Sequence, residues 1–483
     1  MPTTNLGRIG FVSKGDWVAG TYKNLDIVSY LNSLYICKVL TTTADPTVVT
    51  DWDVYVSETN ASNILHTIGS GLANEAYTKA EIDASFSPVS QEVYDIGIAG
   101  TYGFGVGALR NADIPTGWTG LSGHESPASV NYGNYIDPVG SHMVFIPRFW
   151  FKWDGNTPLV SSVPATGYAL HEAFRHAPKG FFRDKTHVGI IGGVPLARMG
   201  IAPASSSSSN NGIGQLVDIA YNHAGFIEAF KTYRSASHHV ESVFESNALA
   251  VLAKAHSAAA KSVFECAFND VAPYMPKGNN NNALADVNDT GVTFQNAGYS
   301  SSALAGSGDP FAKTTHNGQA CGVADINGNL WRINIGMTKA NNTDGIFQVL
   351  KTTVNPNDLT LLNLQDATLY DDIDLTALIG GNLGWVDFGN AAEQVFDSNQ
   401  AINGLDTDIR VTCAGLPKAT GVSASGTTEF GNDGLYRSWT TNLISLAGGF
   451  WSNSATAGAF ARRLDRYSAY SSYNVGAAAC VSL

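Results

Sequence analysis

Residues 447–480 read AGGFWSNSATAGAFARRLDRYSAYSSYNVGAAAC, and this stretch decides how the whole chain is interpreted. Gly448 and Gly449 allow a backbone conformation that is closed to residues with a Cβ atom. Apolar residues recur with the spacing of anchors into a core, at Trp451, Phe460, Leu464 and Val475. The pattern predicts a segment whose apolar anchors are buried in a core and whose intervening residues are exposed.

The residues between these anchors are aromatic, small and polar, or charged, and we take them as candidate binding residues. They are Phe450, Ser452, Asn453, Ser454, Thr456, Arg463, Asp465, Arg466, Tyr467, Tyr470, Ser472 and Tyr473. Tyr supplies a large, rigid contact area, while Ser and Asn supply adaptable hydrogen bonds. Arg adds bidentate and stacking contacts. This combination favours a binding surface over the alternative, an ordinary surface loop rich in Tyr and Ser.

The composition is typical of extracellular and virion-surface proteins that are rich in strands and long loops. The chain has 483 residues, of which 44% are hydrophobic, enough for two to four domains and a large core. Charged residues make up only 14%, against about 25% in an ordinary globular domain. Ser, Thr, Asn and Gly must therefore supply the polar surface.

The charge balance and the hydropathy pattern argue against two kinds of partner. Lys and Arg number 28 and Asp and Glu 41, so the formal net charge of −13 repels phosphate backbones and we expect no nucleic-acid partner. A run of about 18 apolar residues, the length of a transmembrane helix, is absent, so we expect no membrane insertion. The first ten residues also lack the apolar segment of a secretory signal.

The cysteines are few and far apart, which predicts free and mostly buried thiols. They are Cys37, Cys266, Cys321, Cys413 and Cys480. Neither a disulfide framework nor a zinc site has this spacing.

Residues 1–58 are predicted to form a small β module, because short runs rich in Val, Ile and Tyr alternate with turns. The string WVAGTY at 17–22 and a Trp after a Pro near position 52 resemble the small carbohydrate-binding-like β modules of phage tail proteins. The resemblance implies attachment to other phage tail proteins through this N-terminal region. Its aromatic residues would stack on a sugar or form the core of the module, and both alternatives stay open.

Residues 59–93 are predicted to connect this module to the rest of the chain through a short helix. Thr78 and Glu81 have the spacing of a capping box. The string AYTKAEIDA at 76–84 is similar to a helical segment of phage tail fibres that begins a trimeric coil. A helix this short is marginal alone in water, so the resemblance implies a homotrimer.

Residues 94–483 are predicted to form one large unit, which gives the chain a mixed α+β fold class. Strands are expected at 141–152 and 181–189, and helices at about 218–233 and 241–263. The serine tract Ser205–Ser209 is expected to be a flexible loop, inside an insertion at about 205–320.

Three strings in this unit resemble one fold, the formylglycine-generating-enzyme subclass of C-type lectin-like domains. The first is MVFIPRFWFKW at 143–153, with HEAF at 171–174 and GFFRDKTHVG at 180–189. The second is NGNLWR at 327–332, and the third is the stretch at 447–480. Their order is most similar to phage tail-tip adhesins, the group of the major tropism determinant and of the variable proteins of diversity-generating retroelements.

The resemblance implies a tail-fibre tip adhesin of a bacteriophage virion. It would attach to a host surface receptor, protein or glycan, through the variable-type region 447–480. It implies no enzymatic activity and no cofactor, and it leaves a structural Ca²⁺ open. The palette of Tyr, Ser and Asn at 467–474 fits retroelement diversification, which only a genomic template repeat can establish.

Two alternatives are a tail-associated polysaccharide-degrading enzyme and a cellular lectin-fold surface-binding protein. The enzymes of the fold use two reactive cysteines close together, whereas Cys413 and Cys480 are far apart here. Asp371, Asp372 and Asp374 are expected in one loop, where they would cap turns or bind a cation. His238 and His239 are interpreted as a solvated helix start and not as a metal pair, because adjacent side chains on a helix diverge.

Overall fold

The computed structural model describes residues 94–259, 277–340, 343–376, 384–390, 393–397 and 409–483, together with six short stretches between residues 12 and 56. The chain divides into two compact units, Met1–Gln91 and Glu92–Leu483. The predicted connector at 59–93 and its helix lie outside the described residues.

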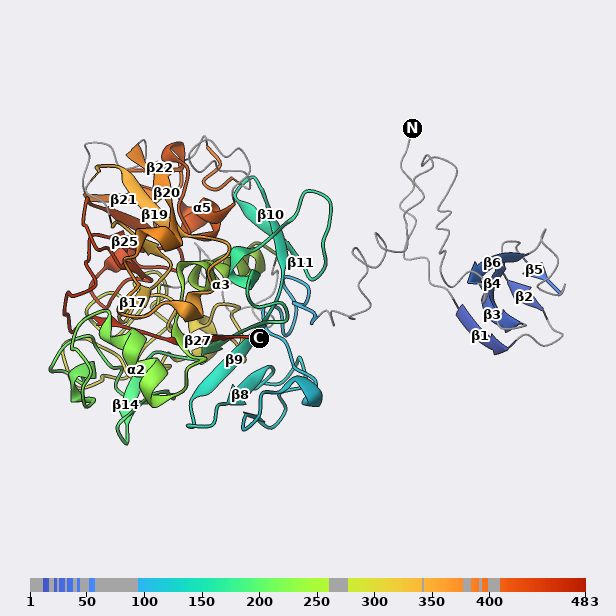
Figure 1. Ribbon diagram of the computed structural model, residues 1–483, viewed down its shortest axis with the longest axis horizontal. Coiled ribbons are helices and arrows are strands. Elements are labelled where there is room, and N and C mark those ends of the chain that lie inside the picture. Colours follow the sequence, from blue (N-terminus) through green and yellow to red (C-terminus); the bar gives the residue numbers. More distant parts are fainter. Residues whose placement is uncertain are drawn as a thin grey trace. The chain divides into compact units, whose positions relative to one another are not determined.

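The N-terminal unit contains the strands that the sequence predicts (Figure 1). Its sheet has the order β1-β3-β4-β6, formed by Val12–Asp16, Asp26–Tyr30, Ser33–Cys37 and Trp52–Val56. A separate ribbon pairs β2 (Tyr22–Lys23) with β5 (Thr41–Thr42). The strands β3 and β4 form a tight hairpin in which Tyr30 pairs with Ser33, next to the predicted turn. Side chains of this unit lie outside the description, so the role of its aromatic residues stays open.

The C-terminal unit is mostly β-sheet, with three α-helices in its described part: α2 (Gly225–Tyr233), α3 (Val243–Ala259) and α5 (Arg410–Cys413). Its larger sheet has seven strands in the order β22-β21-β23-β25-β24-β17-β26. These strands are Val422–Ser423, Gly384–Phe388, Gly434–Arg437, Arg462–Leu464, Ser445–Ala447, Trp331–Asn334 and Val475–Gly476.

The second sheet joins the end of the chain to its early strands. Its order is β16-β27-β13-β9-β8-β7, formed by His239–Val240, Ala479–Ser482, Gly180–Asp184, His142–Pro147, Asn134–Ile136 and Thr119–Gly120. The last strand, β27, runs antiparallel to β13, with Phe182 opposite Val481. The segment after residue 447 therefore begins in one sheet and ends in the other.

Smaller sheets complete the unit. They are β11-β10-β12 (Thr157–Ser161, Trp150–Asp154, Ala169–Leu170), β14-β15 (Val188–Ile191, Val194–Ala197) and β18-β19-β20 (Met337–Thr338, Ile346–Leu350, Tyr370–Asp374).

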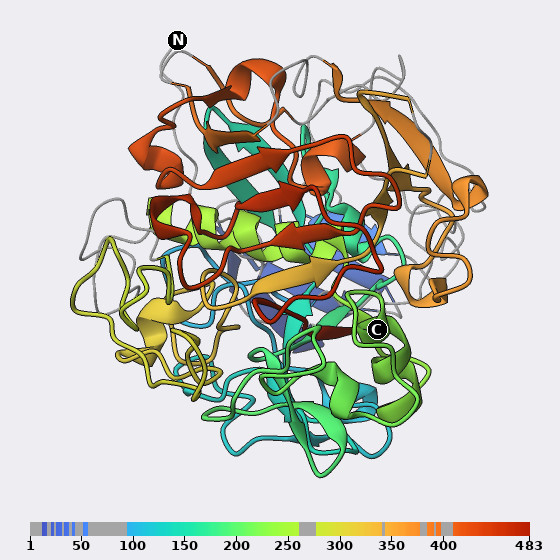
Figure 2. The same ribbon diagram turned by 90° about the vertical axis from the view of Figure 1, so that its left-hand side faces the viewer.

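Helix α3 lies behind the seven-stranded sheet, on the side away from the viewer in Figure 2. Its side chains are buried all round from Val243 to Ser257, including the polar Glu245 and Asn247. A helix that is covered on every side belongs to a core, and its many alanines allow neighbouring strands to approach closely. One face of the sheet is thus covered by α3. On the opposite face Leu446 and Ile333 are also buried, whereas Trp385, which lies in register with them, is 38% exposed.

Several sequence predictions are corrected by the structure. The run 141–152 is two strands, since β9 ends at Pro147, β10 begins at Trp150 and the two belong to different sheets. Helix α2 begins at Gly225 and not near 218, since Asp218 has a φ of +60°, outside the helical region. The aspartates at 371–374 lie on strand β20 and not in a loop.

The serine tract is also corrected. Ser205, Ser206 and Ser207 are buried, so the tract is packed into the unit and is not a freely exposed loop. The tract contacts the segment 447–480 through Ser206, as described below.

Candidate functional site

The four predicted anchors of the segment 447–480 are buried, which confirms that part of the sequence analysis. They are Trp451, Phe460, Leu464 and Val475. Gly448 and Gly449 have φ angles of +93° and +90°. A Cβ atom on Gly448 would lie 2.6 Å from Nη1 of Arg332 and 2.7 Å from the Ile326 carbonyl oxygen. Glycine is therefore required by the backbone conformation and by the crowding.

The tyrosines between the anchors reach the surface. Tyr467 and Tyr473 are 45% and 46% exposed, whereas Tyr470 is partly buried. The rings of Tyr467 and Tyr470 meet edge to face at 5.5 Å, and the Tyr473 ring lies 5.8 Å from that of Trp451. Each exposed ring is thus braced by another ring, which limits the torsional freedom that a ligand would have to freeze.

Three of the four charged residues of the segment form one cluster around Asp465, while the fourth, Arg462, is buried. Arg463 donates from Nε to Oδ1 of Asp465 at 2.6 Å and from Nη2 to Oδ2 at 3.0 Å. Nη1 of Arg466 lies 2.9 Å from Oδ2 of the same carboxylate, and its guanidinium lies 4.7 Å from the centre of the Tyr470 ring. Two guanidiniums share one carboxylate, so the cluster keeps one net positive charge.

Other candidate residues shape the loop as well as bordering its surface. Oδ1 of Asn453 accepts a hydrogen bond from the Phe450 N–H at 2.9 Å, and the Thr456 hydroxyl donates to the Asn453 carbonyl at 2.8 Å. The Ser472 hydroxyl donates to Asn474. Ser452 and Ser454 are exposed. Asn453 and Thr456 therefore contribute to the shape of the loop, while the two serines are free to contact a ligand.

The predicted insertion supports this segment from two sides. Ser206 accepts from the Ser472 N–H at 3.0 Å and donates to the Ser472 carbonyl at 3.0 Å. Nδ2 of Asn280 donates to the Ser454 carbonyl at 2.6 Å, and the Ser454 N–H donates to the Asn280 carbonyl at 2.8 Å. The tracts rich in Ser and Asn thus form the frame that fixes the loops of the segment.

His223 lies directly behind the tyrosines, with its ring 5.5 Å from that of Tyr470. It is fully buried, and neither ring nitrogen has a hydrogen-bond partner among the residues that the structure describes. Burial, followed by the positive charges of Arg466 and Arg463, lowers the pKa of His223 to about 3. The histidine is neutral, and the positive potential of the cluster extends to it.

The sequence analysis missed two residues that lie beside Arg463 on the seven-stranded sheet. On the outer side of the seven-stranded sheet, Trp385 of β21 pairs with Tyr436 of β23, and Tyr436 pairs with Arg463 of β25. The Arg463 guanidinium lies 5.3 Å from the centre of the Tyr436 ring. Alternation in the strings GWVDF and GLYR marks Trp385 and Tyr436 as strand residues, but nothing local shows that these strands neighbour the segment 447–480.

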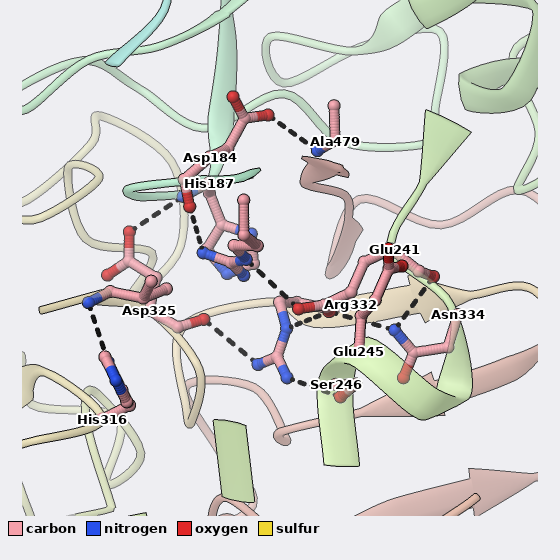
Figure 3. Close-up of polar contacts among 12 residues, drawn as sticks. Asp184, His187, Glu241, Glu245, Ser246, His316, Asp325, Arg332, Asn334 and Ala479 are labelled. Atoms are coloured by element: carbon pink, nitrogen blue, oxygen red, sulfur yellow. Dashed lines mark hydrogen bonds and ion pairs between the residues drawn. The ribbon is translucent and has the colours of Figure 1, made fainter. Parts of the chain in front are cut away.

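A second polar cluster lies inside the unit, centred on Glu241 (Figure 3). Glu241 accepts from Nε of Arg183 at 3.2 Å, from Nε of Arg332 at 2.9 Å and from Nδ2 of Asn334 at 3.0 Å. Nη2 of Arg332 also donates to the Ser246 hydroxyl on α3 at 3.1 Å. Burial raises the pKa of Glu241, but the two guanidiniums outweigh it and lower the pKa to about 2. The hydrogen bonds of this cluster join the sheets to α3. Because the cluster is closed to solvent, it offers no site to a ligand.

The histidine pair 238–239 belongs to the same interior, so the predicted solvated helix start is wrong. Both residues are buried because they lie at β16, which pairs with β27. His239 bonds Glu245 at 2.9 Å, and His238 lies 3.2 Å from the Asp137 carboxylate.

Cys321, Cys413 and Cys480 are free and buried, as predicted for them. In the described part of the chain, no group of three or more His, Cys, Asp or Glu side chains is placed to hold a metal ion. None of the helices described there is long and apolar enough to cross a membrane.

Comparisons of the chain with protein-family models and with curated proteins found no match.

Proposed function

We propose that the chain is a tail-fibre tip adhesin of a bacteriophage, and that it binds a host cell-surface receptor through the outer face of its seven-stranded sheet. The observation that carries the proposal is the build of the segment 447–480. Exposed tyrosines and an arginine cluster stand on loops that buried anchors and the insertion hold in place. A rigid surface rich in Tyr and Arg binds well because little conformational entropy is lost on contact.

The proposed fold is the C-type-lectin-like one, in the formylglycine-generating-enzyme subclass. The strings that carry the resemblance are neighbours in space. Those at 143–153 and 180–189 contribute β9 and β13, which pair in the sheet where β13 also pairs with β27. Those at 327–332 and 447–480 contribute β17, β24, β25 and β26, which adjoin one another in the other sheet. This clustering supports a single ancestral arrangement for the three strings.

A binding role is favoured over the cysteine oxidation that enzymes of this fold perform. Cys413 lies on α5 and Cys480 on β27, and both are buried. Burial raises the pKa of the Cys480 thiol, which disfavours the nucleophilic thiolate. Arg332, at the position where those enzymes carry an acidic residue, is bound to Glu241 inside the unit.

The proposed assembly is a homotrimer at the tip of the tail fibre, joined to other tail proteins through the N-terminal unit. Sedimentation of the full-length protein tests the trimer, since it should run at three times the chain mass of 51.0 kDa. A monomer at micromolar concentration would contradict this part of the proposal.

The function is tested by adding fluorescently labelled full-length protein to a panel of bacterial strains. We expect saturable binding to some strains and not to others, and no release of soluble sugar from the cells that bind. Release of oligosaccharides would favour the polysaccharide-degrading alternative. Absence of binding to every strain would contradict the adhesin.

A further inference from the structure

The outer face of the seven-stranded sheet carries a row of side chains that extends the site beyond residues 447–480. Trp385, Tyr436 and Arg463 are registered neighbours on three adjacent strands. Since adjacent strands are about 4.8 Å apart, the row spans about 10 Å, which is close to the length of a disaccharide. It continues into the Asp465 cluster and the tyrosines.

The rings of this row are held in fixed positions. A Cβ atom on Gly434 would lie 2.8 Å from Cε3 of Trp385. The indole therefore packs directly against the backbone of β23 at Gly434, which has no side chain. Its edge meets the Tyr436 ring at 5.2 Å, and its other neighbour is the Trp331 ring, 6.2 Å away. Even so, Trp385 is 38% exposed. An indole that is braced on three sides and still open offers a stacking surface.

The charge of the row selects an acidic ligand. Arg463 and Arg466 carry two positive charges against the single negative charge of Asp465, in a chain with a net charge of −13. A local positive patch on an acidic protein attracts anions to that patch alone. Guanidiniums bind carboxylates and phosphates in a bidentate geometry, and the C–H faces of sugar rings pack on aromatic rings.

We propose that this row, together with Arg466 beside it, is a subsite for an acidic glycan chain. Sugar rings stack on Trp385 and Tyr436, and a carboxylate or phosphate of the same chain binds the Arg466 guanidinium beside Asp465. The inference rests on the proposed function and names the chemical class of its receptor. A proteinaceous receptor is the competing outcome.

The experiment uses the strain that the full-length protein binds best. Its cells are treated with periodate, which destroys sugar rings, or with proteinase K. Polygalacturonate, alginate and polysialic acid, with neutral dextran as control, are added as competitors. We expect binding to survive proteinase K, to be lost after periodate and to be inhibited by at least one acidic polymer and not by dextran. Loss of binding to proteinase K with survival after periodate would overturn the glycan assignment and leave the adhesin standing.

Variants locate the subsite. Trp385→Ala and Arg466→Glu should each weaken binding at least tenfold, and Arg466→Lys, which keeps the charge, should weaken it less than Arg466→Glu. Tyr102→Ala, at an exposed tyrosine outside the row, is the matched control and should bind as the wild type does. Because Trp385→Ala removes a packed ring, its unfolding midpoint is measured alongside, and Arg466→Glu decides the matter if that variant is unstable. Unchanged binding by folded Arg466→Glu would overturn the subsite.

Discussion

Two carboxylates in the C-terminal unit each hold two arginine guanidiniums, and they differ in what surrounds them. Glu241 and its partners Arg183 and Arg332 have at most 1% of their side chains exposed. Asp465 is 8% exposed, and its two arginines in the surface segment are 17% and 28% exposed. The same pairing of one carboxylate with two guanidiniums is therefore closed to solvent at Glu241 and partly exposed at Asp465.

The difference follows from desolvation. Removing charges from water costs several kcal/mol for each ion, so a buried pair is retained only where every partner is in place. An ion pair at the surface contributes about 0–1 kcal/mol, because water and salt screen it. Substitutions at the partly exposed Asp465 cluster should therefore cost less stability than substitutions at Glu241.

The largest effect is expected from Glu241→Gln, which leaves Arg183 and Arg332 buried without their carboxylate. The free energy of unfolding should fall by about 3–5 kcal/mol, the usual cost of breaking a buried ion pair. Urea unfolding followed by tryptophan fluorescence measures it. The matched change in the partly exposed cluster, Asp465→Asn, should cost less, because its two arginines still reach water. Equal losses in the two variants would contradict the distinction between the clusters.

Acidification should weaken the unit through the buried histidines whose pKa values are lowered to about 3, which are His171, His187, His223 and His316. Of these, His187 and His223 lie one beside each cluster. Burial, and then the nearby arginines, lower the pKa values of His187 and His223 to about 3 in the folded protein. In the unfolded chain both histidines would titrate near 6.5, so at mildly acidic pH they bind protons in the unfolded chain and stay neutral in the folded protein. Their contribution is complete above pH 6.5 and is lost as the pH falls toward 3.

Between pH 7.5 and 5.5 this loss amounts to about 1.4 kcal/mol for each histidine, or about 3 kcal/mol for His187 and His223 together. Unfolding free energies at pH 7.5, 6.5 and 5.5 measure it, and His223→Gln should make the decline shallower. Equal declines in the wild type and His223→Gln would show that His223 does not keep its lowered pKa in the folded protein.

A smaller effect is expected where the surface segment meets the interior. Gly448 and Gly155 both have positive φ angles, but a Cβ atom on Gly155 would meet nothing within 4 Å, whereas one on Gly448 would collide with Arg332. Gly448→Ala should therefore destabilise the protein by about 2 kcal/mol more than Gly155→Ala, the usual cost of forcing atoms into a packed interior. Thermal unfolding of the two variants compares them, and similar losses would mean that only backbone strain matters.

The sequence predicted the anchors and the exposed tyrosines because local spacing carries that information. Trp451, Phe460, Leu464 and Val475 are recognisable from their apolar spacing alone. The roles of Trp385 and of the serine tract could not be predicted, since they depend on strand pairing and loop contacts between residues far apart in the chain.

The buried ionic residues escaped prediction for a related reason. Charged and histidine side chains are usually exposed, and only their partners make burial tolerable. His238 and His239 were assigned to solvent because their partners Asp137 and Glu245 become visible only in the folded chain.

The central claim, that the exposed face of the segment 447–480 binds the receptor, is tested most directly with one variant. Full-length protein carrying Tyr467→Ala, Tyr470→Ala and Tyr473→Ala is compared with the wild type for binding to intact host cells, after circular dichroism has confirmed that both are folded. A tyrosine at the centre of an interface contributes about 2 kcal/mol or more, so the loss of one such contact among the three is enough to lower binding at least about thirtyfold. Equal binding by the folded variant and the wild type would contradict the claim and move recognition elsewhere on the chain.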